Sequence, residues 1–165
     1  MAARGTAEPI PAATGARIHV RLAAVPLAVD AVRVLVADPG AGATVVMVGS
    51  TREATGAELT AALHYEAHEP LAQRLLEGIL AAAAAAHGLA AAAIEHRLGR
   101  VAVGEASIVV AVAAAHRRAA FAAAEWIVDE VKRTVPIWKC DEAPDGSRRW
   151  AHPGDLRAVV AGEFR

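Results

Sequence analysis

The stretch SIVVAVAAAHRRAAFAAAEWIVDEVKRTVPIWKCD, residues 107–141, decides the fold. Its apolar beginning predicts a strand over Ser107–Ala113, since a short apolar run bounded by polar residues is typical of a buried strand. A helix is predicted from about Arg117 to Arg133, and a proline that cannot continue a helix ends it. We expect this helix to turn one face to the core, formed by Phe121, Ala124, Val128 and Val131. A short strand over Ile137–Asp141 then returns.

The rest of the chain mixes helices with mainly neighbouring strands. Strands are predicted at Ile18–Leu22, Thr44–Gly49, Leu59–Tyr65 and Ala92–Leu98, and helices at Leu27–Val36 and Pro70–Ala86. This pattern favours an α+β fold with mainly antiparallel strands and two long helices. A chain of 165 residues fits one domain. We expect that domain at 17–152, between a flexible N-terminal tail, 1–16, and a C-terminal tail, 153–165.

Composition excludes several classes of protein. A formal net charge of −1 removes the global positive field that most nucleic-acid binders use, so any basic site must be local. The longest apolar stretch, Ile79–Ile94, is interrupted by His87 and Gly88 and falls short of the roughly 20 residues of a membrane span. Residues 1–15 lack the continuous apolar core of a signal peptide. With a single cysteine and no internal disulfide, the chain is expected to be cytoplasmic.

A basic group opens the second long helix. His116, Arg117 and Arg118 follow the apolar strand, at a place where unpaired backbone N–H groups and the helix dipole already favour an anion. Cations at that end oppose the dipole, an arrangement that makes sense if a phosphate or carboxylate binds among them. The same residues also fit a solvated basic turn, and this feature alone does not separate the two interpretations.

Two lysines follow at the other end of this helix. Lys132 lies near its end, and on an extended segment a period of two places Lys139 and Asp141 on one face, with Trp138 and Cys140 on the other. Asp141 can then orient Lys139. A partly desolvated lysine beside other cations suits proton transfer near neutral pH. In the alternative interpretation, Lys132 only complements the helix dipole and Lys139 is a surface residue.

One further cation arrives from an earlier loop. Arg52 lies between Gly49 and Gly56 and offers a planar fork to a phosphate or carboxylate. The histidines are scattered, and no cysteine or histidine spacing indicates a zinc site. Neither glycine-rich nucleotide-binding loop is present. We therefore predict no metal and no cofactor.

Three motifs together resemble the large, catalytic subunit of molybdopterin synthase. They are VGSTRE (48–53), LHYEAH (63–68) and IEHRLGRVAVGEASIVVAVAAAHRRAAFAAAEWIVDEVKRTVPIWKCD (94–141), and the resemblance runs from about Ile18 to Trp150. Each motif is modest, but their order and spacing are specific. The resemblance implies an α/β-hammerhead fold and a central homodimer with one small subunit at each end.

The resemblance also implies an activity. The family transfers sulfur, converting cyclic pyranopterin monophosphate (precursor Z) to molybdopterin. The sulfur comes from the C-terminal thiocarboxylate of a ubiquitin-like small subunit. An alternative is a noncatalytic dimeric module that binds such a C-terminal tail or an anionic metabolite.

By motif, the resemblance assigns roles to residues. Arg52, His116 and Arg117 would hold the substrate phosphate or the terminal carboxyl group of the partner. Lys132 and Lys139 would form the reacting centre, with Lys132 as the main acid/base or electrostatic group, and Asp141 would line the substrate site. The family usually has glutamate where Asp141 stands and a basic residue where Cys140 stands.

Overall fold

The computed structural model describes residues 10–11 and 15–151, so most of both predicted tails lies outside the described residues. The helices are α1 (Val29–Leu35), α2 (Glu69–His87) and α3 (Arg117–Thr134). The strands are β1 (Ile10–Pro11), β2 (Arg17–Ala23), β3 (Ala43–Ser50), β4 (Ala54–Thr55), β5 (Glu58–Leu59), β6 (Ala62–Ala67), β7 (Leu89–Arg97), β8 (Gly99–Ala102), β9 (Ala106–Ala114), β10 (Ile137–Glu142) and β11 (Arg148–Trp150).

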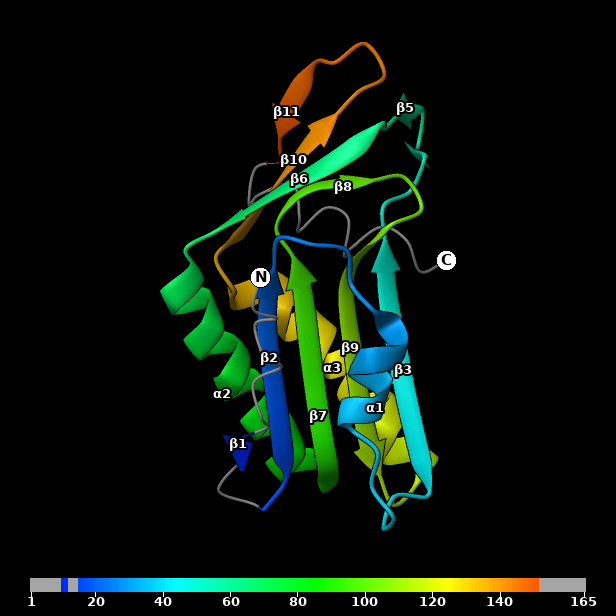
Figure 1. The fold of residues 1–165 in the computed structure, drawn as a ribbon, viewed down its shortest axis with the longest axis vertical. Helices are drawn as coiled ribbons and strands as arrows, with labels where there is room; N and C mark the ends of the chain where they lie inside the picture. Colours follow the sequence, from blue (N-terminus) through cyan, green and yellow to red (C-terminus); the bar gives the residue numbers. More distant parts are fainter. Residues whose placement is uncertain (1–9, 12–14, 152–165) are drawn as a thin grey trace, which may run out of the picture.

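The centre of the molecule is a five-stranded sheet in the order β1-β2-β7-β9-β3 (Figure 1). Only the β2–β7 pair is parallel, and the other neighbours are antiparallel. This arrangement confirms the α+β class with mainly antiparallel strands. Strands β7 and β9 are buried along nearly their whole length, which explains their continuous apolar sequence.

The two faces of this sheet are covered by different helices. Helices α2 and α3 cover one face, where Leu76, Ile94 and Ile127 are fully buried in the larger core. The short helix α1 packs on the other face through Val32 and Val36. The strand residues beneath α1 are mostly small: Ala91, Ala93, Val109, Ala111 and Ala113. Alanine adds little bulk there, so the short helix can lie close to the strands.

A second sheet, in the order β11-β10-β6-β8, lies beyond one end of the first (Figure 1). All its pairs are antiparallel. The strand predicted over Ile137–Asp141 is its second member, whereas β8 and β11 were not anticipated. Strand β8 lies between the predicted strands Ala92–Leu98 and Ser107–Ala113 and pairs with β6 from Ala62 to Tyr65. A four-residue strand that begins with glycine carries too weak a pattern to stand out in the sequence.

The predicted core face of α3 is wrong at Phe121, whose residue surface is 63% exposed. The helix instead buries Ala120, Ala123, Ala124, Ile127 and Val131. These positions follow the i, i+3, i+4, i+7 spacing of a helical stripe, and Phe121 stands one residue away from it, about 100° around the helix. The prediction failed because it assigned the large apolar side chain of Phe121 to the core, whereas mainly small alanines form the side of α3 that lies against the sheet.

Within the described ranges, none of the helices has the length and apolar character needed to cross a membrane.

Candidate functional site

The basic end of α3 is built by the junction between β9 and the helix. His116 is the N-cap residue with extended backbone angles, and its side chain makes no capping hydrogen bond. The first helical turn contains no acidic residue, and Arg117 and Arg118 are exposed. The backbone just before His116 passes close to Gly42, since a Cβ atom added to Gly42 would lie 2.5 Å from the Ala115 carbonyl oxygen. His116 and Arg117 are both exposed after this close contact.

The opposite end of α3 leads into the lysine pair. Lys132 is exposed in the last turn, and Lys139 is half-buried on β10. The Lys139 Nζ atom lies 3.4 Å from Asp141 Oδ2, which confirms that these side chains share one face of the strand. Cys140 is buried at 2% exposure on the other face, as predicted. Asp141 thus reaches Lys139 although its side chain is shorter than the glutamate expected there.

A residue to which the sequence assigned no role lies directly across from Lys139. Tyr65 is the β6 partner of Lys139, so the two side chains lie on the same face of the sheet. Burial raises the pKa of Tyr65, a hydrogen bond with Ser107 lowers it, and the charge of Asp141 raises it again. Because the net direction is upward, the phenol is protonated at neutral pH. The motif LHYEAH contained this residue, but its strand partner cannot be read from the motif.

Tyr65 rests on a buried histidine. The rings of Tyr65 and His96 meet edge to face, with centroids 4.9 Å apart. Burial lowers the pKa of His96 to about 4, although the hydrogen bond from its Nδ1 to the Arg97 carbonyl oxygen opposes that shift. At neutral pH the imidazole is uncharged. A neutral aromatic pair therefore lies beside Lys139 and joins the outer sheet to the central one.

Arg52 is exposed and lies in the loop after β3, next to the buried Thr51. Strand β3 runs antiparallel to β9, and α3 turns back after β9, so β3 and α3 run in the same general direction (Figure 1). The loop that carries Arg52 therefore lies at the end of the central sheet where α3 finishes. Arg52, Lys132 and the Lys139–Asp141 pair belong to this end.

The two ends of α3 do not meet within one chain. With a rise of about 1.5 Å per residue, the helix separates Arg117 from Lys132 by about 22 Å. The single pocket predicted from residues 115–141 is thus divided into two half-sites. One contains Arg52, Lys132, Lys139 and Asp141, and the other contains His116 and Arg117.

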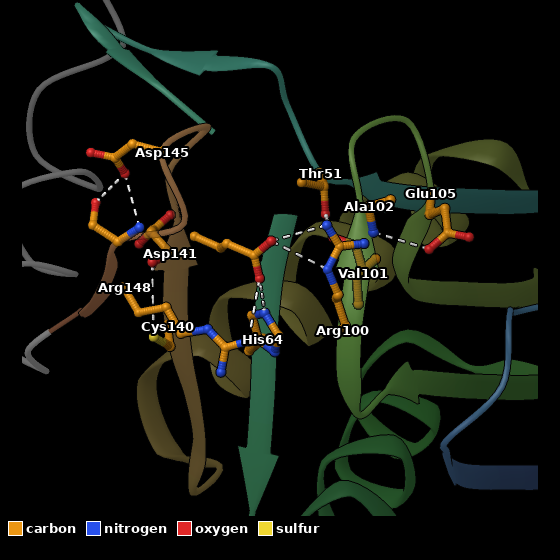
Figure 2. A network of polar contacts seen from close by, with 12 residues as sticks. Thr51, His64, Arg100, Val101, Ala102, Glu105, Cys140, Asp141, Asp145 and Arg148 are labelled. Carbon is orange, nitrogen blue, oxygen red and sulfur yellow. Dashed lines mark hydrogen bonds and ion pairs between the residues drawn. The ribbon is translucent and has the colours of Figure 1, made fainter. Parts of the chain in front are cut away.

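A carboxylate hub at Glu142 holds the back of the outer sheet, and its partners His64, Arg100 and Arg148 are labelled in Figure 2. Its carboxylate contacts His64 of β6, Arg100 of β8 at 3.0 Å and Arg148 of β11 at 3.5 Å. Hydrogen bonds from Arg100 and then from His64 lower the pKa of Glu142 to about 2. All four strands are therefore connected through one charged group, which lies on the face of β10 opposite to Lys139.

No group of three or more His, Cys, Asp or Glu side chains suited to a metal ion occurs in the part of the chain that the structure describes.

The structure is an α+β domain with exposed cations at both ends of α3 and a lysine–carboxylate pair on β10. The family model described as MoaE protein matches residues 22–134. The molybdopterin synthase catalytic subunit of Aspergillus oryzae is 39% identical over 150 residues, covering 88% of this chain and 84% of that protein. The chain belongs to the MoaE family, the catalytic subunits of molybdopterin synthase.

Solved structures agree with this assignment. Molybdopterin synthase from Staphylococcus aureus superposes with a TM-score of 0.75 at 30% identity, covering 79% of this chain and 95% of that one. A chain from the complex of subunits 1 and 2 of molybdopterin-converting factor from Helicobacter pylori shares the fold, with a TM-score of 0.67 at 23% identity. That match covers 80% of this chain and 89% of the other.

Proposed function

We propose that this protein transfers sulfur to cyclic pyranopterin monophosphate (precursor Z) and so forms molybdopterin. The sulfur comes from the C-terminal thiocarboxylate of a ubiquitin-like small subunit. The observation that carries the proposal is the half-site at the end of α3, where Arg52, Lys132 and the Lys139–Asp141 pair belong to one end of the fold. Membership of the family supplies the substrate and the partner.

The chemistry of these residues suits the reaction. Attack by sulfur and opening of a cyclic phosphate build negative charge, and fixed cations in a shielded site stabilise such charge more strongly than water does. Arg52 binds the phosphate or the terminal carboxyl group of the small subunit. Lys132 acts as the acid/base or electrostatic centre, and Lys139, oriented by Asp141, assists it.

The remaining half-site comes from a second copy of the chain. Because His116 and Arg117 lie about 22 Å from Lys132 in their own chain, they can complete a pocket only in another. A two-fold homodimer provides that arrangement, since each copy then gives its basic helix end to the lysines of the other. The assembly is a heterotetramer with two small subunits, and we place it in the cytoplasm.

Replacing the central lysine tests the activity. Lys132→Ala, mixed with the thiocarboxylated small subunit and precursor Z, should lower dithiolene formation by at least about a hundredfold. Arg133→Ala is the matched control, because Arg133 is an exposed cation one residue further along the helix and pairs with Glu130. Product formation by Lys132→Ala at the wild-type rate would remove this residue from the mechanism. A wild-type protein that forms no product with a competent partner would instead indicate a noncatalytic binding module.

Mixed dimers test the sharing of the pocket. Lys132→Ala and Arg117→Ala should each be inactive as homodimers. Co-assembled in equal amounts, they should regain about a quarter of the wild-type activity, because half of the dimers are mixed and each mixed dimer has one intact pocket. If a pocket belonged to one chain alone, the mixture would stay inactive.

A further inference from the structure

The residue before Arg52 is hydrogen-bonded to the β8–β9 turn, residues 102–105, which connects β8 of the outer sheet to β9 of the central sheet. The amide of Thr51 donates to the Glu105 carbonyl oxygen at 3.0 Å, and the Gly104 amide donates to the Thr51 carbonyl oxygen at 2.9 Å. The Thr51 hydroxyl donates to the Val101 carbonyl oxygen at 3.4 Å (Figure 2). The β8–β9 turn therefore fixes the position of the backbone that leads into Arg52.

Two charged side chains, Glu105 and Arg97, hold the β8–β9 turn. The Glu105 carboxylate accepts a hydrogen bond from the Ala102 amide at 3.0 Å and lies 3.9 Å from Arg97 Nη1. Arg97 also donates through Nη2 to the Arg100 carbonyl oxygen at 3.2 Å. Arg97 thus contacts both β8, at Arg100, and the β8–β9 turn, at Glu105.

Folding alone does not account for Arg97. The residue is 8% exposed, and its Nε and Nη1 atoms have no hydrogen-bond partner among the described residues. Burying an incompletely paired guanidinium lowers stability. These two nitrogens are closed to solvent, so an external anion does not reach them. Arg97 forms its ion pair with Glu105, which belongs to the β8–β9 turn.

We propose that Arg97, through Glu105, is a positioning residue that fixes the β8–β9 turn and with it the direction of Arg52. This inference rests on the proposed role of Arg52 in binding the phosphate or the small subunit's carboxyl group. Arg97 itself touches neither. Its contribution is geometric, and misplacement of a binding group by about 1 Å can cost up to about a hundredfold in rate.

Activity of the assembled enzyme gives the first test. Arg97→Met should lower kcat/KM by about tenfold, mainly through a higher KM, because Arg52 acts in binding. Glu105→Gln should shift KM in the same direction, since the amide can still accept from Ala102 but lacks the charge that attracts Arg97. Arg100→Met is the matched control, because it removes a cation from β8, next to the turn, while leaving the Arg100 carbonyl oxygen in place.

A double-mutant cycle tells positioning from a general structural effect. In an Arg52→Ala background, Arg97→Met should cause no further loss, because the residue that it positions is gone. A full tenfold loss in that background would overturn the proposal. So would wild-type KM for Arg97→Met.

Hydrogen exchange keeps the test independent of the role of Arg52. Amides in segments 49–56 and 102–107 should exchange faster in Arg97→Met than in Arg100→Met. If Arg52→Ala is fully active, the proposed binding role of Arg52 fails. Faster exchange in Arg97→Met would still show that Arg97 holds the β8–β9 turn. Unchanged exchange would overturn the inference whatever Arg52 does.

Discussion

The two sheets of this molecule are held together in different ways. The five-stranded sheet is enclosed by helices on both faces, and the strands at its middle are lined by fully buried residues such as Ile94, Val109 and Val110. The four-stranded sheet has two exposed tryptophans, Trp138 and Trp150, and its strands converge on one carboxylate. Apolar burial therefore sets where α3 lies, while charge pairing shapes the surface that presents the lysine.

The largest expected effect comes from the apolar sheet. Ile127→Ala removes a fully buried side chain from the face of α3 that contacts the sheet, and should lower the free energy of unfolding by about 2–5 kcal/mol. Urea denaturation measures the change. Phe121→Ala, on the same helix but exposed, should stay within about 0.5 kcal/mol. A larger loss there would mean that another copy of the chain covers Phe121.

The contact between the sheets should make stability depend on pH. His96 has a folded pKa of about 4, below its ordinary 6.5, so the unfolded chain takes up a proton first as the pH falls. Stability should therefore drop between pH 6.5 and pH 4, by roughly 3 kcal/mol, and this contribution should not change further below pH 4. His96→Gln should flatten that part of the curve in urea titrations. An unaltered slope in the variant would assign the titration to another group.

The tight junction at the start of α3 should resist added volume. Gly42→Ala places a methyl group 2.5 Å from the Ala115 carbonyl oxygen, so the backbone before His116 must move. We expect a loss of about 1–3 kcal/mol in unfolding free energy together with weaker substrate binding. Gly78→Ala is the control, because a Cβ atom there meets nothing within 4 Å. Equal effects of the two changes would contradict a special role for the junction.

The smallest effect is expected at the carboxylate hub. Glu142 has a folded pKa of about 2, below its ordinary 4.5, so its stabilising effect is present above pH 4.5 and is lost as the pH falls from 4.5 to 2. Glu142→Gln should weaken the acid dependence in that window only. Circular dichroism during acid titration would detect it. A variant that loses stability equally at pH 7 and pH 3 would show that the hub acts through shape rather than charge.

Much of the fold could be predicted from periodicity, because the long elements carry strong patterns. Helix α2 begins at a Glu-Pro pair and ends at His87, one residue beyond the predicted Ala86, where Gly88 adopts the left-handed conformation. Strands β8 and β11 could not be predicted, since they are short and exist through their partners. Phe121 misled because an apolar side chain was weighed by size rather than by its angle around the helix.

Within the candidate site, too, only the contacts between residues close in sequence could be predicted. Local spacing was sufficient to pair Lys139 with Asp141, because two residues on one strand share a face regardless of the rest of the fold. Tyr65 and Arg97 could not be found that way. Their relevance comes from cross-strand register and from contacts with residues further along the chain: Tyr65 contacts His96, 31 residues away, and Arg97 contacts Glu105, 8 residues away.

The length of α3 has a consequence for how this chain can vary. In the proposed dimer the helix is a spacer between two half-sites, and one inserted residue would move its far end by about 1.5 Å and turn it by about 100°. Lys132 would then point away from its pocket while the helix itself stayed intact. Surface loops can change length at little cost. A change in the length of this helix would instead misplace one half-site relative to the other. We therefore expect its length of eighteen residues to tolerate insertions and deletions less well than the surface loops do.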